Sequence, residues 1–250
     1  MAYLQEQFGY TVHYNTPINN TDDLARLEAD HDAIFIGIGL GNTRSVGIPG
    51  EDLKNSLGAT EYIETLRMQH ANAQAGNRVI VLGGGNTAMD AASESARMGA
   101  SNVILAYRNA KENMSAYEFE YDLAKGVGVK GWFNVQPKAI LGENGAVSGV
   151  QFIRTEVVDG KLTEIAGSEF EEPCDMVIRA TGQEKQRNWL SQINGLELDA
   201  RGCIVVDESF QTTNPKYFAG GDAVNGGAEV VNGAFEGKVA ANGIASWLGV

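Results

Sequence analysis

The segment Arg78–Arg108, RVIVLGGGNTAMDAASESARMGASNVILAYR, carries the clearest structural pattern in the chain. Its β-branched beginning, Arg78–Leu82, predicts a short buried strand, and the three glycines after it predict a turn. The alanine-rich stretch Asn86–Met98 predicts a helix that ends at Gly99, and Asn102–Tyr107 predicts a second strand. Because two strands joined through a helix pair in parallel, this segment indicates an α/β fold.

The rest of the chain repeats this alternation. Before the segment, we predict a helix over 2–8 stopped by Gly9, a strand at 11–14, a helix from Thr21, a buried strand within 32–41 and a helix over 59–74. After it, we predict a helix near 115–125, antiparallel strands within 149–165 joined at Asp159-Gly160, a buried strand at 175–180, strands at 203–206 and 217–219, and a helix over 229–248. The order of these elements gives an expected α/β fold class, with parallel sheets and an antiparallel β-meander.

Composition narrows the functional classes. The 250 residues include 19 Lys and Arg against 32 Asp and Glu, a formal charge of −13 that argues against nucleic acid as a partner. The 31 glycines accompany only 5 prolines, so they indicate places of close backbone approach rather than low complexity. Cys174 and Cys203 are far apart, and no secretory or membrane-spanning segment is evident, so we expect a cytoplasmic protein without a membrane partner.

Two common kinds of site are not expected. The three histidines, His13, His31 and His70, fall in separate segments without metal-ligand spacing, so we predict no metal site. No G-x-S-x-G sequence occurs, which argues against an α/β-hydrolase.

The glycine turn after the first strand matches a dinucleotide fingerprint, Gly83-x-Gly85-x-x-Ala88. Gly83 permits the tight turn, Gly85 lets a pyrophosphate approach the backbone, and Ala88 lets the helix lie close to the strand. The helix N-terminus adds N–H donors and a positive dipole end. The residues predicted to hold the pyrophosphate are Gly83, Gly84, Gly85, Asn86, Thr87 and Ala88, and the alternative is a turn with a purely structural role.

The end of the second strand indicates the nucleotide. NAD-binding proteins usually place an acidic residue there, about 20 residues past the glycines, for the ribose 2′-hydroxyl. This chain has Arg108 and nearby Lys111, with no carboxylate until Glu112. We therefore predict that Arg108 binds a 2′-phosphate and that NADP(H) is favoured over NAD(H). The alternative is a solvated surface charge.

The run PKYFAGGDAVNGGAEVVNGAFEGKVAA, residues 215–241, resembles the second flavin-binding motif of flavoproteins with two dinucleotide-binding domains. The resemblance implies that Gly221 and Asp222 contact FAD, with Asp222 at its ribityl and phosphate end. It also implies that backbone N–H groups near Val230 and Val231 face the pyrimidine end of the flavin. A strand, glycine turn and Asp helix cap is the structural alternative.

Two shorter segments resemble the linkers of the same superfamily, where the chain crosses between cofactor domains. They are Ile36-Gly37-Ile38-Gly39 and Ile178-Arg179-Ala180-Thr181-Gly182. By this resemblance Gly182 joins the expected cofactor-binding residues.

Within this superfamily, the pyridine nucleotide-disulfide oxidoreductases, residues 78–108 with Met114 and the helix after it resemble the small subunit of glutamate synthase and its relatives, including the flavin part of dihydropyrimidine dehydrogenase. The resemblance implies hydride transfer from NAD(P)H to FAD and electron delivery through iron–sulfur clusters to a partner subunit or domain. No catalytic side chain is implied, because the cofactors supply this chemistry. The substrate or final acceptor and the oligomeric state stay open.

The sequence departs from the family in three places. It shows neither the N-terminal cysteine-rich region nor the first G-x-G-x-x-G unit, so we expect an incomplete FAD domain and a native coding sequence that extends upstream. Asn109 stands where the family usually has a second basic residue. By this resemblance we expect two Rossmann-like dinucleotide-binding domains, each a three-layer parallel sheet, of which the FAD domain is incomplete. We expect residues 1–49 and 184–250 to form the partial FAD domain, 76–183 the NAD(P)H domain, and 50–75 a connecting segment.

Two other functions are considered. One is a truncated module that binds NADP(H) but holds no stable FAD and does not turn over. The other is an S-adenosylmethionine-dependent methyltransferase, which shares a glycine-rich strand–helix turn. It would predict an acidic residue after the second strand and does not explain Phe218–Asp222.

Overall fold

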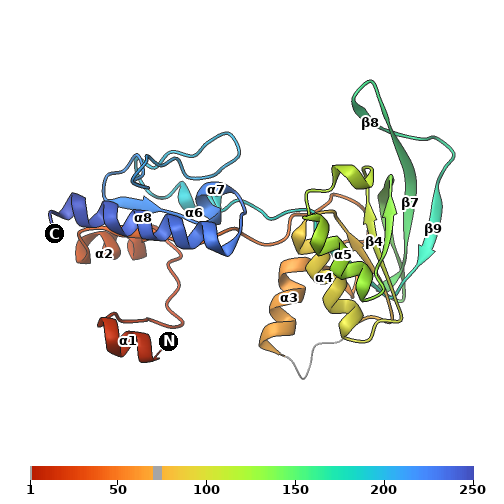
Figure 1. The fold of residues 1–250 in the computed structure, drawn as a ribbon, viewed down its shortest axis with the longest axis horizontal. Coiled ribbons are helices and arrows are strands. Elements are labelled where there is room, and N and C mark those ends of the chain that lie inside the picture. Colours follow the sequence, from red (N-terminus) through yellow and green to blue (C-terminus); the bar gives the residue numbers. More distant parts are fainter. Residues whose placement is uncertain (1, 70–74) are drawn as a thin grey trace. The chain divides into compact units, whose positions relative to one another are not determined.

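The computed structural model describes residues 2–69 and 75–250. It contains two compact units, one formed by residues 1–41 with 185–250 and the other by residues 42–184. The chain therefore passes between the units twice, at 41–42 and at 184–185 (Figure 1). The second unit is continuous in sequence and the first is not.

The division differs from the predicted one on its N-terminal side. Residues 42–49 belong to the second unit, because the Arg44 amide donates a hydrogen bond to the Gly182 carbonyl and Thr43 forms a bridge with Gln183. The predicted connecting segment 50–75 is also part of that unit as far as it is described, since it supplies a strand and a helix of the unit's core. Residues 70–74 lie outside the described residues.

A five-stranded parallel sheet forms the centre of the second unit. Its strand order is β2-β10-β3-β4-β5, and all four neighbouring pairs are parallel. The bounds are β2 Ser56–Gly58, β3 Arg78–Leu82, β4 Asn102–Tyr107, β5 Lys130–Phe133 and β10 Met176–Arg179. The predicted strands at 78–82 and 102–107 are confirmed, and the strand predicted at 175–180 is β10.

Both faces of this sheet are buried, because successive side chains of a strand point to opposite faces. Val79 and Val81 pack with the helices on one face, whereas Ile80 and Leu82 pack with an antiparallel meander on the other (Figure 1). The helices are α3 Ala59–Met68, α4 Asn86–Arg97 and α5 Glu118–Gly126, with a 3-10 turn, η1, at Lys111–Asn113. The second unit therefore has three layers, with the meander in place of a second helix layer.

The meander is built around one long strand. It comprises β6 Val135–Glu143, β7 Ala146–Val158, β8 Lys161–Glu164 and β9 Phe170–Pro173. Asp159 and Gly160 both have positive φ, 50° and 74°, between paired residues Val158 and Lys161, which confirms the predicted connection and makes it a type I′ turn. Strands β2, β5, β6 and β9 were not predicted. In β6, Pro137 and Gly142 interrupt the alternation.

The first unit has a small sheet of its own. Strand β1, Ile34–Ile36, pairs in parallel with β11, Tyr217–Ala219. The helices of this unit are α1 Ala2–Phe8, α2 Thr21–Asp30, α6 Arg187–Leu190, α7 Asp222–Asn225 and α8 Val230–Leu248. The Asn20 carboxamide caps α2 by accepting from the amides of Asp22 and Asp23, both at 3.0 Å. The predicted helices over 2–8, from Thr21 and over 229–248 are confirmed within one residue.

Two predicted strands are wrong. Residues 11–14 pair with no strand in the part of the chain that the structure describes, and Tyr14 is exposed. Residues 203–206 make only single-residue bridges, because the Asp207 carboxylate accepts from the amides of Ser209 and Gln211 and turns the chain immediately afterwards. The helix predicted over 59–74 ends at Met68, and its remaining part after Gln69 lies largely outside the described residues. No helix within 2–69 or 75–250 is long and apolar enough to cross a membrane.

Candidate functional site

A cavity of about 610 Å³ opens at the carboxyl ends of the parallel strands of the second unit. This edge is where open α/β sheets bind their ligands. Of the predicted site residues, the lining includes Gly83, Gly84, Gly85, Thr87, Arg108 and Gly182. It also includes residues that were not predicted, namely Arg44, Ser45, Val46, Ile48, Leu82, Ala106, Tyr107, Ser115, Gln136, Pro137, Ala180 and Thr181.

The first two glycines of the turn are needed for packing. Gly83 has φ 152°, and a Cβ there would collide with the carbonyl oxygen of Ala180 at the end of β10. A Cβ on Gly84 would lie 2.6 Å from Cδ2 of Tyr107. Side chains at either position would therefore push the turn away from the neighbouring strand ends.

Gly85 has a different surrounding. It is the N-cap residue of α4, which has no side-chain capping hydrogen bond among the described residues. A Cβ on Gly85 would meet only the Ser115 hydroxyl, at 3.3 Å, and both residues line the cavity. The helix N-terminus therefore opens toward space that the protein leaves unfilled, which is the arrangement that suits an anion.

Asn86 and Ala88 are not part of the cavity lining. Ala88 is fully buried in the core between α4 and the sheet, consistent with a small residue that lets the helix lie close. The Asn86 side-chain oxygen accepts the Tyr117 amide at 3.0 Å and so fixes the chain ahead of α5.

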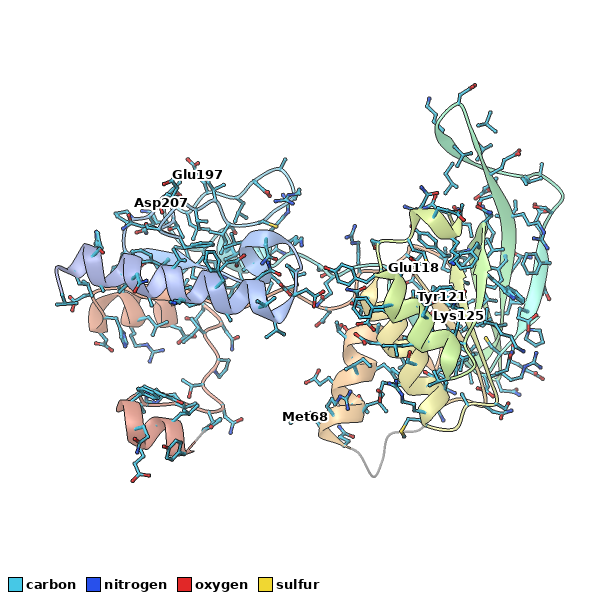
Figure 2. The ribbon with its side chains drawn as sticks, viewed as in Figure 1. Met68, Glu118, Tyr121, Lys125, Glu197 and Asp207 are labelled. Carbon is cyan, nitrogen blue, oxygen red and sulfur yellow. The ribbon has the colours of Figure 1, made fainter. Side chains whose placement is uncertain are left out.

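Arg108 follows β4 and lines the cavity with an exposed side chain. Its carbonyl oxygen accepts a 2.6 Å hydrogen bond from the Thr155 hydroxyl of β7, which fixes the backbone from which the guanidinium extends. Lys111 does not line the cavity. Its ammonium lies 5.5 Å from the ring centroid of Tyr121 on α5, the residue labelled beside Lys125 in Figure 2. Of the two basic residues noted after β4, only Arg108 faces the cavity.

One wall of the cavity comes from residues 44–48, where no site residue was predicted. The Glu51 carboxylate accepts the amides of Val46, Gly47 and Ile48 at 3.2, 2.6 and 2.9 Å. It also pairs with Arg179 of β10 at 2.7 Å. Partial burial raises the pKa of Glu51, but hydrogen bonds from Ile48, Ser45, Val46 and Gly47 outweigh it and hold the pKa below 4.5.

A second carboxylate anchors the start of the same wall. Glu61 accepts the Thr43 amide at 3.0 Å and the Thr43 hydroxyl at 2.8 Å. Burial raises the pKa of Glu61, yet these hydrogen bonds and one from Thr60 keep the pKa below its ordinary value. A loop held by acidic residues on both sides of Arg44 has no distinct sequence motif, which is why pattern analysis missed it.

Replacing Glu51 with glutamine should destabilise the second unit by about 2–4 kcal/mol at pH 7, because charge-assisted hydrogen bonds are lost and the half-buried Arg179 loses its partner. The folded pKa of Glu51 lies below 4.5, so its contribution is present above that pH and is lost as the pH falls through the folded value. Denaturant unfolding should therefore show that the difference in free energy of unfolding between Glu51→Gln and the wild type narrows below pH 4.5.

The control is Glu143→Gln, which removes an exposed carboxylate without a salt bridge in the described part of the chain. We expect it to change the free energy of unfolding by less than about 0.5 kcal/mol. Equal stabilities of Glu51→Gln and Glu143→Gln at pH 7 would contradict this role of Glu51.

The remaining predicted site residues lie in the first unit. Gly221, with φ 69°, precedes α7, and its amide donates to the buried carboxylate of Glu236. The Asp222 carboxylate accepts the Ala228 amide at 3.1 Å and so closes the loop between α7 and α8. Val230 and Val231 form the first turn of α8, with side chains 89% and 71% exposed.

This arrangement brings a glycine turn and a helix N-terminus together. A Cβ placed on Gly233 of α8 would lie 3.9 Å from the Gly221 Cα, so the helix begins close to the turn. Glu236 was not predicted as a site residue, and its carboxylate also accepts a hydrogen bond from the Asn225 side chain at 3.0 Å. A buried glutamate that ties α8 to the turn has no signal in the sequence beyond its place in an apolar stretch.

The continuous parallel sheet, the strand–glycine turn–helix unit and the cavity at the carboxyl ends define a Rossmann-type α/β protein. Comparison with known proteins specifies the family. Residues 9–237 match the family Pyridine nucleotide-disulphide oxidoreductase, and the chain belongs to that family. This confirms the superfamily that the sequence motifs indicated.

Individual relatives agree with this assignment. The chain is 38% identical to the protein named Glutamate synthase [NADPH] small chain of Escherichia coli, over 97% of this chain and 56% of that protein. It is 33% identical to the NADP(+)-dependent formate dehydrogenase subunit beta of Moorella thermoacetica, over 96% of this chain and 35% of that protein. The chain thus spans about half the length, or less, of these curated relatives.

A solved structure supports the fold. The thioredoxin reductase of T. acidophilum superposes with a TM-score of 0.70 and is 25% identical, over 86% of this chain and 65% of that one. The α/β fold class with dinucleotide-binding folds is therefore confirmed.

Proposed function

We propose that this chain is the nicotinamide- and flavin-binding part of an NAD(P)H-dependent flavin oxidoreductase of the glutamate synthase small-subunit type, with NADPH as its preferred donor. The observation that carries the nucleotide assignment is the cavity of the second unit, in which an uncapped helix N-terminus, the open Gly85 and Arg108 face the same space. The positive end of the helix dipole, the backbone amides of the turn and the Arg108 guanidinium are together suited to a phosphorylated dinucleotide.

In this proposal Gly83, Gly84, Gly85, Asn86, Thr87 and Ala88 form the pyrophosphate turn. Arg108 binds the 2′-phosphate, and Gly182 lies at the other side of the cavity. The residues fit the group, because a Cβ on Gly85 would occupy cavity space and, among the residues that the structure describes, no carboxylate lines the cavity to repel a phosphate. The second unit, rather than the predicted range 76–183 alone, is the proposed NAD(P)H domain.

The first unit is the proposed FAD-binding part. Gly221 and Asp222 would hold the ribityl and phosphate end, and the amides of Val230 and Val231 would face the flavin ring. The fit rests on the positive φ of Gly221, the close start of α8 and the exposure of the first turn of α8. When bound, NADPH supplies a hydride and FAD accepts it, while the protein contributes position and a positive helix end near the ring.

The proposed acceptor of the electrons is a partner subunit or domain with iron–sulfur clusters. Two similar proteins support a partner by their names, since one is a small chain of glutamate synthase and the other a beta subunit of formate dehydrogenase. The chain's net charge of −13 suits a partner that is not a nucleic acid.

Absorbance of the purified protein tests the proposal. We expect a yellow protein with flavin bands that bleach when NADPH is added under anaerobic conditions, and bleach more slowly with NADH at equal concentration. A colourless protein that binds NADPH would favour the binding-only module, and faster bleaching with NADH would contradict the preference for NADPH. A protein that binds neither nucleotide would contradict the nucleotide assignment as a whole.

A further inference from the structure

A second arginine faces the cavity of the second unit, and its backbone is fixed on the loop that follows β10. The Arg44 amide donates to the Gly182 carbonyl at 2.9 Å, and the Arg44 carbonyl accepts from the Thr181 hydroxyl at 3.2 Å. Arg44, Thr181 and Gly182 all line the cavity. The two carboxylates described above, Glu51 and Glu61, hold the chain on either side of Arg44.

The Arg44 side chain lies over the end of β10. A Cβ on Gly182 would come within 3.1 Å of Nη2 of Arg44, so a glycine at that position leaves room for the guanidinium. No ion pair recorded for residues 2–69 and 75–250 engages Arg44. In a chain with formal charge −13, an arginine that faces a cavity without a carboxylate partner is suited to an anionic ligand.

The strand order places the two cavity arginines on opposite sides of the glycine turn. Strand β3, which leads into the turn, lies between β10 and β4. Arg108 follows β4, whereas Arg44 covers the end of β10. The end of the second strand of a Rossmann unit, here β4, receives the adenosine ribose, and the pyrophosphate lies over the turn. The nicotinamide half of a bound dinucleotide therefore extends toward β10 and Arg44.

We propose that Arg44 binds the phosphate on the nicotinamide side of the dinucleotide. This rests on the proposed nucleotide function and assigns a different phosphate of the dinucleotide to each of the two arginines. Arg44 contacts a group that NADPH and NADH share, so it contributes equally to the affinity for both. Arg108 contacts the 2′-phosphate, which only NADPH carries, and so it sets the preference.

Titration calorimetry of the full chain with NADPH, NADH and adenosine 2′,5′-bisphosphate tests which phosphate each arginine binds. The third ligand carries the adenosine-side phosphates and no nicotinamide-side phosphate. We expect Arg44→Ala to raise the Kd for NADPH and for NADH about tenfold each, and to leave the Kd for adenosine 2′,5′-bisphosphate within about twofold. Unchanged binding of the third ligand also shows that the variant is folded, and Arg44→Lys should recover part of the loss.

The matched control is Arg97→Ala, which removes an arginine paired with Glu94 at 3.0 Å in the last turn of α4, outside the cavity lining. It should leave all three Kd values unchanged. The inference is overturned if Arg44→Ala changes no Kd, if it weakens NADPH alone, or if it weakens adenosine 2′,5′-bisphosphate as much as NADPH. A wild-type protein that binds none of the three ligands overturns the proposed function itself, and the inference with it.

Discussion

Replacing Arg108 with alanine should raise the Kd for NADPH by about 10- to 100-fold and leave the Kd for NADH within about twofold. A charge-assisted hydrogen-bond pair from a guanidinium to a phosphate contributes about 1.5–3 kcal/mol, and each 1.4 kcal/mol corresponds to a tenfold change in Kd. Arg108 is the only basic residue of the segment after β4 that lines the cavity, as far as the structure describes that segment. The preference for NADPH should therefore fall by the same factor.

Lys111→Ala is the matched control for this experiment. It removes a positive charge three residues away, but the Lys111 ammonium lies over the Tyr121 ring rather than at the cavity. We expect a change of less than about twofold in the Kd for either nucleotide. If Lys111→Ala weakened NADPH binding as much as Arg108→Ala, the effect would be general electrostatic attraction, not recognition of the 2′-phosphate.

Substitutions at two adjacent glycines should separate nucleotide binding from folding. Gly85→Ala should raise the Kd for NADPH and NADH at least tenfold while the melting temperature changes by less than about 2 °C. Its Cβ meets only the Ser115 hydroxyl, at 3.3 Å, and its φ of −102° is allowed for alanine. The added methyl group instead occupies space that the pyrophosphate needs.

Gly84→Ala should instead act mainly on the stability of the protein. Its Cβ would lie 2.6 Å from the Tyr107 ring, and such overpacking typically costs about 1–3 kcal/mol. Thermal unfolding and calorimetry on the same samples measure both effects. A stable Gly84→Ala variant, or a Gly85→Ala variant with wild-type affinity for both nucleotides, would contradict the roles assigned to these glycines.

The sequence predicted the parts of the fold that depend on local pattern. The strand at 78–82, the helix after Gly85 and the type I′ turn at Asp159 and Gly160 each have a local cause, such as β-branched residues, a glycine turn or two positive φ angles. The strands that were wrong or missed depend on how the chain pairs with nearby segments, which the pattern within one segment does not show. Residues 203–206 find only single-residue bridges, whereas β6 tolerates Pro137 because its long partner β7 supplies the pairing.

The residues of the candidate site could likewise be predicted only where a local pattern fixes their position. Arg108 could be predicted because its position is counted from the glycine turn within one strand–helix–strand unit. Arg44 could not, since it reaches the cavity through a hydrogen bond to Gly182, which lies more than a hundred residues further along the chain. Glu51, which holds the same wall through three nearby amides and Arg179, likewise becomes visible only in three dimensions.

The double crossing between the two units has a consequence for biosynthesis. Because residues 42–184 are continuous, the second unit is complete on the ribosome before residues 185–250 have been made. Strand β1, by contrast, pairs with β11, which is made much later. At roughly 5–20 residues per second, β11 is translated on the order of ten seconds or more after β1. During that interval β1 lacks its β11 partner, and an unpaired strand edge is a place where wrong strand pairing can begin.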